Sequence, residues 1–297
     1  MSLRLVSLML ALQFAAAAGY AQHPSDAASM EVRTKLAREL LTAWELPNFI
    51  DALKQGLISQ DPGAGCFCEI AEEDEDKISS AWRSSVEANF NTHEVSEHVA
   101  ASLAKHQSAS ALKRTLEFAT SPLGRKLTKA ALNTPKSTIK QTANAEVVGE
   151  FALLTKGMES LKRNPRRAKV IKDLIRVTEA VEWQTEIMMS VWNGTMAGRA
   201  SLPRKNGPRL PEDAIDEVVG SQRMQIAELF ASIIPATFAQ TYSEISTKEL
   251  VHYVTWLRTP DAKAITTALN SALARGLNVT AIKIGADFGK HIDASDI

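Results

Sequence analysis

Apolar residues recur at spacings of three and four along most of this chain, which is the period of an amphipathic α-helix. Clusters of Val, Ile and Thr that would favour strands are few. Pro47 is expected to kink or break the first apolar segment. The sequence therefore predicts an all-α fold, with helical segments at 30–57, 77–90, 94–106, 109–119, 122–132, 134–160, 169–191, 212–220, 223–242, 246–258 and 260–276.

The second half of the chain repeats part of the pattern of the first half. In one register the aligned identities are Ser108 with Ser246, Leu112 with Leu250, Pro122 with Pro260, Thr128 with Thr266 and Ala130 with Ala268. In a second register they are Lys35 with Lys169, Leu40 with Leu174 and Glu45 with Glu179. Amphipathic helices resemble one another by chance, but the matches here fall on helix faces and caps, where packing requires them.

These matches predict two diverged helical-bundle units packed together, at 30–160 and 168–280, with a C-terminal tail at 281–297. A repeat this long indicates two domain-sized units rather than a solenoid of short repeats. The basic run from Lys162 to Arg167 is the expected boundary between the units. This run, extended to Lys172, is either a solvated linker or a contact for anionic lipid headgroups.

A helix corner occurs in both units. Ser121 and Pro122 suit the cap and the first position of a helix, and Thr259 and Pro260 repeat the pattern. The segment from Phe118 to Leu127, which includes Gly124, resembles the aromatic-x-x-Ser-Pro-x-Gly corner of bacterial periplasmic proteins of the domain of unknown function 2059 family. The resemblance implies an all-helical, exported protein and brings no catalytic residue with it. In the second corner, Ala262 stands at the position of Gly124.

The N-terminus has the pattern of a cleaved signal peptide over residues 1–21. Arg4 precedes an apolar stretch from Leu5 to Ala18, and Gly19 and Ala21 are the small residues of a cleavage site. The alternative is a membrane anchor, but the stretch is shorter than the roughly 20 residues that span a bilayer. We therefore expect a periplasmic or secreted protein, with no transmembrane segment in the mature chain.

Composition narrows the possible partners. Hydrophobic residues make up 45% of the 297 residues, and 34 Lys and Arg balance 34 Asp and Glu. An overall neutral chain does not favour binding to nucleic acid, which requires a basic face. The partner is therefore expected to be an envelope protein or an apolar ligand.

Two loops of opposite charge are the candidate binding sites. The first carries Cys66, Cys68, Glu72, Glu73 and Asp74. The second, in a Gly- and Pro-rich segment at 193–211, carries Arg199, Arg204 and Lys205. The two cysteines form a strained disulfide, a redox pair or two free thiols, and they are too few for a zinc site. We expect the loops to differ in function because they are where the two units differ most.

The sequence contains no recognisable catalytic, metal or cofactor motif. His93 and His98 are five residues apart, whereas a helical zinc-protease motif needs two histidines four apart on one face. No phosphate loop, dinucleotide fingerprint or nucleophile elbow is present. The favoured function is therefore a non-catalytic binding or envelope-interaction protein. The alternatives are a carrier of an apolar small molecule or lipid, held near Met188 to Met196, and a hydrolase with an unrecognised site.

Overall fold

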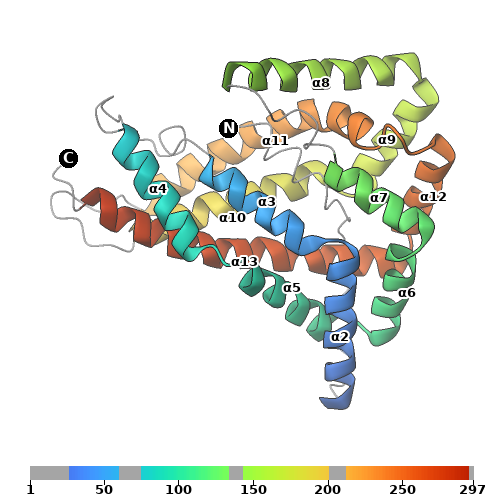
Figure 1. Cartoon of the computed structure of the whole chain (residues 1–297), viewed down its shortest axis with the longest axis horizontal. Coiled ribbons are helices and arrows are strands. Elements are labelled where there is room, and N and C mark those ends of the chain that lie inside the picture. The colour runs from blue at the N-terminus through green and yellow to red at the C-terminus, as the bar shows by residue number, and fades with distance from the viewer. Residues whose placement is uncertain (1–26, 60–74, 134–142, 201–211, 294–297) are drawn as a thin grey trace.

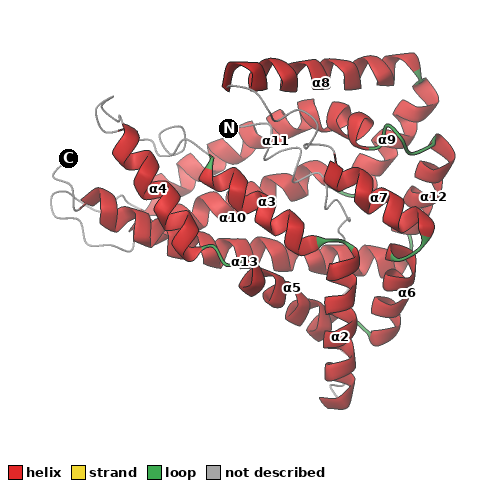
Figure 2. Cartoon of the chain, viewed as in Figure 1, coloured by secondary structure: helices red, strands yellow, loops and turns green. Residues whose placement is uncertain are grey.

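The computed structural model of the chain describes residues 27–59, 75–133, 143–200 and 212–293. This part of the chain is all-α, and no strand occurs in it (Figures 1 and 2). The fold-class prediction is confirmed at this level. The helices are α2 (Ala27–Ala43), α3 (Leu46–Ile58), α4 (Glu75–Asn89), α5 (Thr92–His106), α6 (Ala109–Ala119), α7 (Pro122–Asn133), α8 (Ala143–Arg163), α9 (Pro165–Val177), α10 (Ala180–Ala200), α11 (Glu212–Thr241), α12 (Thr247–Leu257) and α13 (Pro260–Asp293).

The helices surround one continuous hydrophobic core, which includes residues from Ala37 in α2 to Phe288 in α13. The long helix α13 runs through the molecule and packs against α4, α5, α6 and α10 (Figure 1). Trp82 of α4 joins the C-terminal end of α3 to the C-terminal part of α13. Its indole N–H donates to the carbonyl of Leu57 at 2.7 Å, and its ring contacts Phe288 edge to face.

Two helix breaks have the same geometry. α2 ends where Glu45 adopts a left-handed backbone with φ 53°, and α9 ends where Glu179 does so with φ 46°. Each Glu amide donates to the carbonyl three residues earlier, and each Glu carbonyl accepts from the amide four residues later. Few residues other than Gly adopt this conformation, which costs about 1–2 kcal/mol. The free-energy cost of this conformation is offset here by the burial of the residue that follows each break, Leu46 and Ala180.

The two corners also share their hydrogen bonds. The Ser121 and Thr259 hydroxyls each donate to the carbonyl three residues earlier, both at 2.7 Å. The Gly124 amide donates to the Ser121 hydroxyl at 3.0 Å, and the Ala262 amide donates to Thr259 at 3.4 Å. A Cβ on Gly124 would lie 2.6 Å from the Ala119 carbonyl oxygen. The first corner is therefore tighter than the second.

Close packing of α10 on α13 depends on glycines. A Cβ on Gly194 would lie 2.5 Å from the Asn278 carbonyl oxygen, and one on Gly198 would meet the Ile282 backbone. From the other helix, a Cβ on Gly285 would meet the Thr195 backbone. Residue numbers rise together along both helices, so the two run parallel. Only residues without a side chain allow backbones to approach this closely.

Several predicted helix limits are wrong. The expected helix at 169–191 is interrupted at Glu179, although neither Gly nor Pro marks the break. The expected loop at 193–211 begins later, because Gly194 and Gly198 pack against α13 inside a helix that runs to Ala200. The two helices expected at 212–220 and 223–242 are the single helix α11. The C-terminal tail, expected to be a short helix or frayed, is instead a continuation of α13 to Asp293, because Ile284 and Phe288 are buried.

The break expected near Pro47 is confirmed, and Pro47 lies in the first turn of α3, where its missing N–H is not needed. Among the described helices, none is both long and apolar enough to span a lipid bilayer.

Replacing Gly285 with Ala tests the α10–α13 contact. The added methyl group would collide with the Thr195 backbone and force the helices apart. We expect Gly285→Ala to lower the free energy of unfolding by about 1–3 kcal/mol, as measured by urea denaturation. Gly220→Ala is the control, because a Cβ there has nothing within 4 Å. Ala favours helix, so the control should gain up to about 1 kcal/mol. Equal stability of Gly285→Ala and wild type would contradict the contact.

Candidate interaction surface

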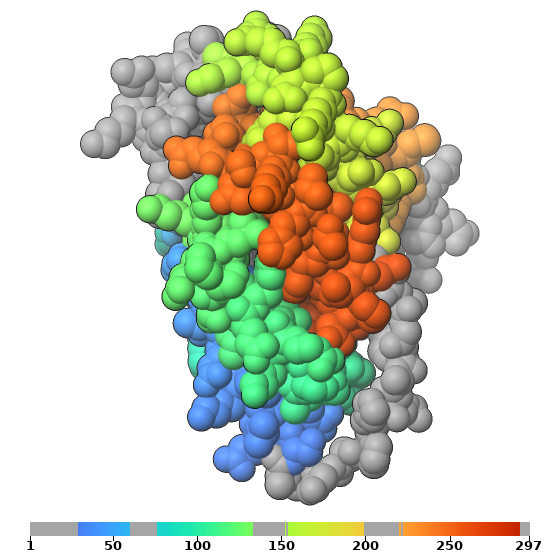
Figure 3. Space-filling model, turned by 90° about the vertical axis from the view of Figure 1, so that its right-hand side faces the viewer, coloured from blue at the N-terminus to red at the C-terminus, as the bar shows by residue number. Residues whose placement is uncertain are grey.

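One end of the molecule gathers a large positive charge. Figure 3 shows this face, with α6 and α7 beside α12 and with the segment of α8 and α9 next to α12. Together α6, α7, α9 and α12 contain eleven Lys and Arg but only three Asp and Glu, a net charge of +8. Because the whole chain is neutral, with 34 of each sign, the rest of it carries −8. We call the surface of these four helices the basic end.

Helix α9 places its cations outward because of its strong amphipathic pattern. Asn164 caps the helix by accepting from the Arg167 amide at 3.0 Å, and Pro165 occupies its first turn. Ile171 and Leu174 are buried on the inner face. The outward positions of α9 are exposed and basic; they are Arg166, Lys169, Lys172 and Arg176.

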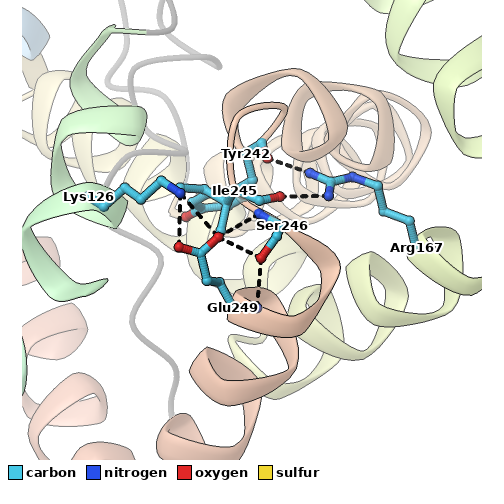
Figure 4. Close-up of polar contacts among 6 residues, drawn as sticks. All are labelled: Lys126, Arg167, Tyr242, Ile245, Ser246 and Glu249. Atoms are coloured by element: carbon cyan, nitrogen blue, oxygen red, sulfur yellow. Dashed lines mark hydrogen bonds and ion pairs between the residues drawn. The ribbon is translucent and has the colours of Figure 1, made fainter. Parts of the chain in front are cut away.

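Arg167 is the exception on α9, since only 8% of it is exposed. Its guanidinium donates to the Ile245 carbonyl at 2.7 Å and to the Tyr242 carbonyl (Figure 4). Burial lowers the pKa of Arg167 from its usual value. The two hydrogen bonds hold α9 against the turn between α11 and α12. The interpretation of the run from Lys162 to Lys172 as a solvated linker is therefore wrong. Only Asn164 separates α8 from α9, and α9 contains the rest of the run.

A second polar contact fixes the start of α12. Ser246 caps the helix by accepting from the Glu249 amide, and the Glu249 carboxylate accepts from the Ser246 amide at 2.8 Å. Lys126 of α7 also donates to this carboxylate at 2.8 Å (Figure 4). The hydrogen bonds from Lys126 and Ser246 lower the pKa of Glu249 to about 2. The carboxylate therefore stays ionised and ties α7 to α12.

Two further carboxylates of this region are also engaged by cations, whereas Glu117 of α6 is exposed and has no ion pair within the described residues. Asp173 lies 2.8 Å from Arg176 and 3.8 Å from Arg258, and Asp261 at the start of α13 pairs with Arg114. Seven exposed cations of the basic end have no carboxylate partner within the described residues. They are Lys113, Arg125, Lys129, Arg166, Lys169, Lys172 and Lys248.

An aromatic stack joins α6 to α12 beneath these charges. The rings of Phe118 and Trp256 lie parallel within 7°, with centroids 3.8 Å apart. Tyr253 stacks on both at longer centroid distances of 6.2 and 6.1 Å. Phe118 and Trp256 are the aromatic residues of the two corners, so the two corners meet through this contact.

The loop residues predicted from the sequence are not tested by the structure. Cys66, Cys68, Glu72, Glu73, Asp74, Arg204 and Lys205 lie outside the described residues. Arg199 belongs to the last turn of α10, but its side chain lies outside the described part of the chain. The prediction that these loops bind a partner therefore stays a prediction.

The corner residues have structural roles. Ser121 and Thr259 cap helices, Pro122 and Pro260 are the first residues of α7 and α13, and Gly124 permits a close turn. Of the Met residues proposed to line a ligand groove, Met188 and Met189 are buried in the core. Within the described residues, no group of three or more His, Cys, Asp or Glu is arranged to hold a metal ion.

The sequence pattern indicated only the part of the basic end that lies in the run from Lys162 to Lys172, because elsewhere net charge was considered for the whole chain. A net charge calculated helix by helix would have found that α7 and α9 are strongly basic, with +3 and +4. It would not have shown that these helices share one face with α12. That knowledge requires the contacts of α12 with α9 and with α6 and α7.

No protein-family model, curated protein or solved structure matches the chain. The resemblance of the corner around Ser121 to the domain of unknown function 2059 family therefore remains a prediction, which rests on the motif alone.

Replacing Arg167 with Met tests the buried hydrogen bonds at this end. The change removes the Arg167 donor from the buried Ile245 carbonyl and one of the two donors to the Tyr242 carbonyl, which also accepts from the Ile245 amide. We expect the free energy of unfolding to fall by about 2–4 kcal/mol, because hydrogen bonds to charged groups contribute more than neutral ones. Arg166→Met alters an exposed neighbour and should change stability by less than about 0.5 kcal/mol. If the two variants were equally stable, the role of Arg167 would be refuted.

The pH dependence of stability tests the Glu249 contact. The pKa of Glu249 is about 2 in the folded chain and 4.5 ordinarily, so its ionised form stabilises the fold above pH about 4.5. This contribution is lost as the pH falls toward 2. We expect the stability difference between wild type and Glu249→Gln, measured by urea unfolding, to shrink over that range. Glu244→Gln, at an exposed position without an ion pair in the described chain, should show no such trend. A constant difference for Glu249→Gln would contradict the contact.

Proposed function

We propose that the chain is a non-catalytic binding protein of the cell envelope, which holds an anionic partner on its basic end. The observation that carries the proposal is the separation of charge in a neutral chain, with +8 on four adjoining helices and −8 elsewhere. Charge gathered on one surface, rather than net charge, steers and orients a charged partner. Seven of the cations are exposed and have no carboxylate partner in the described chain. These side chains can therefore contact an anionic partner.

The make-up of the protein interior supports the proposal that binding takes place on the surface of the protein. Most of the buried side chains are apolar and come from almost every described helix, and they include Met188 and Met189. The polar contacts beside the basic end hold helices together, as Arg167 does through two backbone carbonyls. Glu249, the carboxylate with the most strongly lowered pKa there, is fully engaged by Lys126 and Ser246. These groups serve the fold rather than a reaction.

The location in the envelope is part of the proposal. It is supported by the signal-peptide pattern of residues 1–21, with Arg4 before the apolar stretch from Leu5 to Ala18. An exported protein meets membrane surfaces and the exposed faces of other envelope proteins, and phosphate or carboxylate groups on either would be anionic ligands for the basic end.

We also propose that the fold arose from two diverged copies of one helical unit. The matched breaks at Glu45 and Glu179 support it, since both residues adopt the same rare backbone conformation. The two corners support it through equivalent hydrogen bonds. The packing is also similar, because α2 contacts α5 and α6 as α9 contacts α11 and α12. The basic end lies where the two corners meet, through Phe118 and Trp256.

Retention on a sulfonate cation-exchange resin at neutral pH tests the proposed function. The chain should be retained although its net charge is zero, or −1 once residues 1–21 with Arg4 are removed, because one face presents cations without a carboxylate partner in the described chain. The double variant Lys169→Glu, Lys172→Glu should elute at clearly lower salt. The control is Arg83→Glu with Lys290→Glu, which changes the net charge equally but on α4 and the end of α13, away from the basic end (Figure 1). Equal shifts for both double variants would refute a localised anion-binding surface.

A further inference from the structure

We infer that the partner of the basic end is the surface of an anionic phospholipid bilayer, on which the protein docks peripherally. This inference rests on the proposed function and names its partner. Docking on a bilayer requires a broad outward-facing set of cations and apolar groups that can enter the interfacial region. It does not require a deep cleft.

The unpaired cations are spread over a wide face rather than a single row. Lys113 belongs to α6, Lys129 to α7, Lys172 to α9 and Lys248 to α12. Helix α12 lies between α9 and the pair of α6 and α7 (Figure 3). A peptide would engage one row of such cations, whereas a bilayer presents negative charge over a whole plane and engages all four helices together. The breadth of the basic end therefore favours a bilayer.

The outward face of α12 combines basic and apolar character. Lys248 and Arg258 are exposed at its two ends, and Val251 between them is 46% exposed. The only carboxylate of this helix, Glu249, turns toward Lys126 of α7. A face with exposed cations around an apolar side chain matches the boundary between headgroups and acyl chains. Lys side chains reach the headgroups while their methylenes cover apolar surface.

The aromatic residues of the basic end argue against single-stranded nucleic acid as the partner. Such proteins stack bases on open aromatic faces. Here the rings of Phe118 and Trp256 stack on each other at 3.8 Å, and Tyr253 stacks beside them. All three rings are buried or half-buried. They join helices, so they are not a platform for bases.

The charge of the rest of the chain would fix the orientation at a membrane. With −8 outside the basic end, the remaining surface is repelled by anionic headgroups. The molecule therefore has one face that is attracted and others that are not. This polarity gives a single docked orientation, and the attraction weakens as salt screens the charges.

Co-sedimentation of the full chain with lipid vesicles tests the inference. The probes are vesicles of phosphatidylcholine with phosphatidylglycerol and vesicles of phosphatidylcholine alone, over a series of salt concentrations. We expect binding to the anionic vesicles only, weakening as salt rises. Two double variants, Lys169→Glu with Lys172→Glu and Lys113→Glu with Lys129→Glu, should each bind at least about tenfold more weakly. The control Arg83→Glu with Lys290→Glu should bind within about twofold of wild type. Circular dichroism checks that every variant is folded.

Three results would overturn the inference. If the protein bound neutral and anionic vesicles equally well, it would not recognise charge. If the control variant lost as much vesicle binding as the two test variants, the effect would come from net charge rather than from a docking face. Failure to bind anionic vesicles, when the same protein is retained on the sulfonate resin through Lys169 and Lys172, would reject the bilayer but keep the proposed function. In that case, binding to single-stranded DNA or to an acidic polypeptide would identify the class of partner instead.

Discussion

The parallel contact between α10 and α13 is the constraint on which the rest of the fold depends. α13 also packs against α4, α5, α6 and α12, and α10 packs against α9 and α11, so the pair connects the two halves of the chain. Gly194, Gly198 and Gly285 let the two backbones approach within contact distance. Each glycine inside a helix costs about 1 kcal/mol relative to Ala. The close approach compensates by bringing many atoms into van der Waals contact.

The basic end is a second constraint, and it opposes stability. Cations on four adjoining helices repel one another, and exposed ion pairs such as that of Lys126 with Glu249 stabilise only slightly. The cohesion of this end comes instead from buried contacts. These are the guanidinium of Arg167 on two carbonyls, the stack of Phe118 on Trp256, and the burial of Leu250 and other apolar residues of α12. A charged surface held by such contacts is available for a partner.

Sequence patterns predicted most helices because the signals for them are local. The corner at Ser121 and Pro122 and the cap at Ser246 act within a single helical turn, and both helices begin where expected. The prediction failed where long-range contacts override local preference. Glu179 interrupts a strongly periodic segment without a Gly or Pro signal, and Gly194 and Gly198 continue a helix in a segment whose composition favours a loop.

The sequence by itself determined the all-α class, the amphipathic faces and the two Ser/Thr-Pro corners, because each depends on residues within a few positions of one another. It also placed a cluster of cations between Lys162 and Lys172, but could not say which of them faces solvent. Only the tertiary structure decided that Arg167 is buried, that α9 packs on α12, and that α12 meets α6 and α7 on the same face (Figure 3). The physical reason is that charge and burial depend on neighbours in space, and these neighbours are distant in the chain.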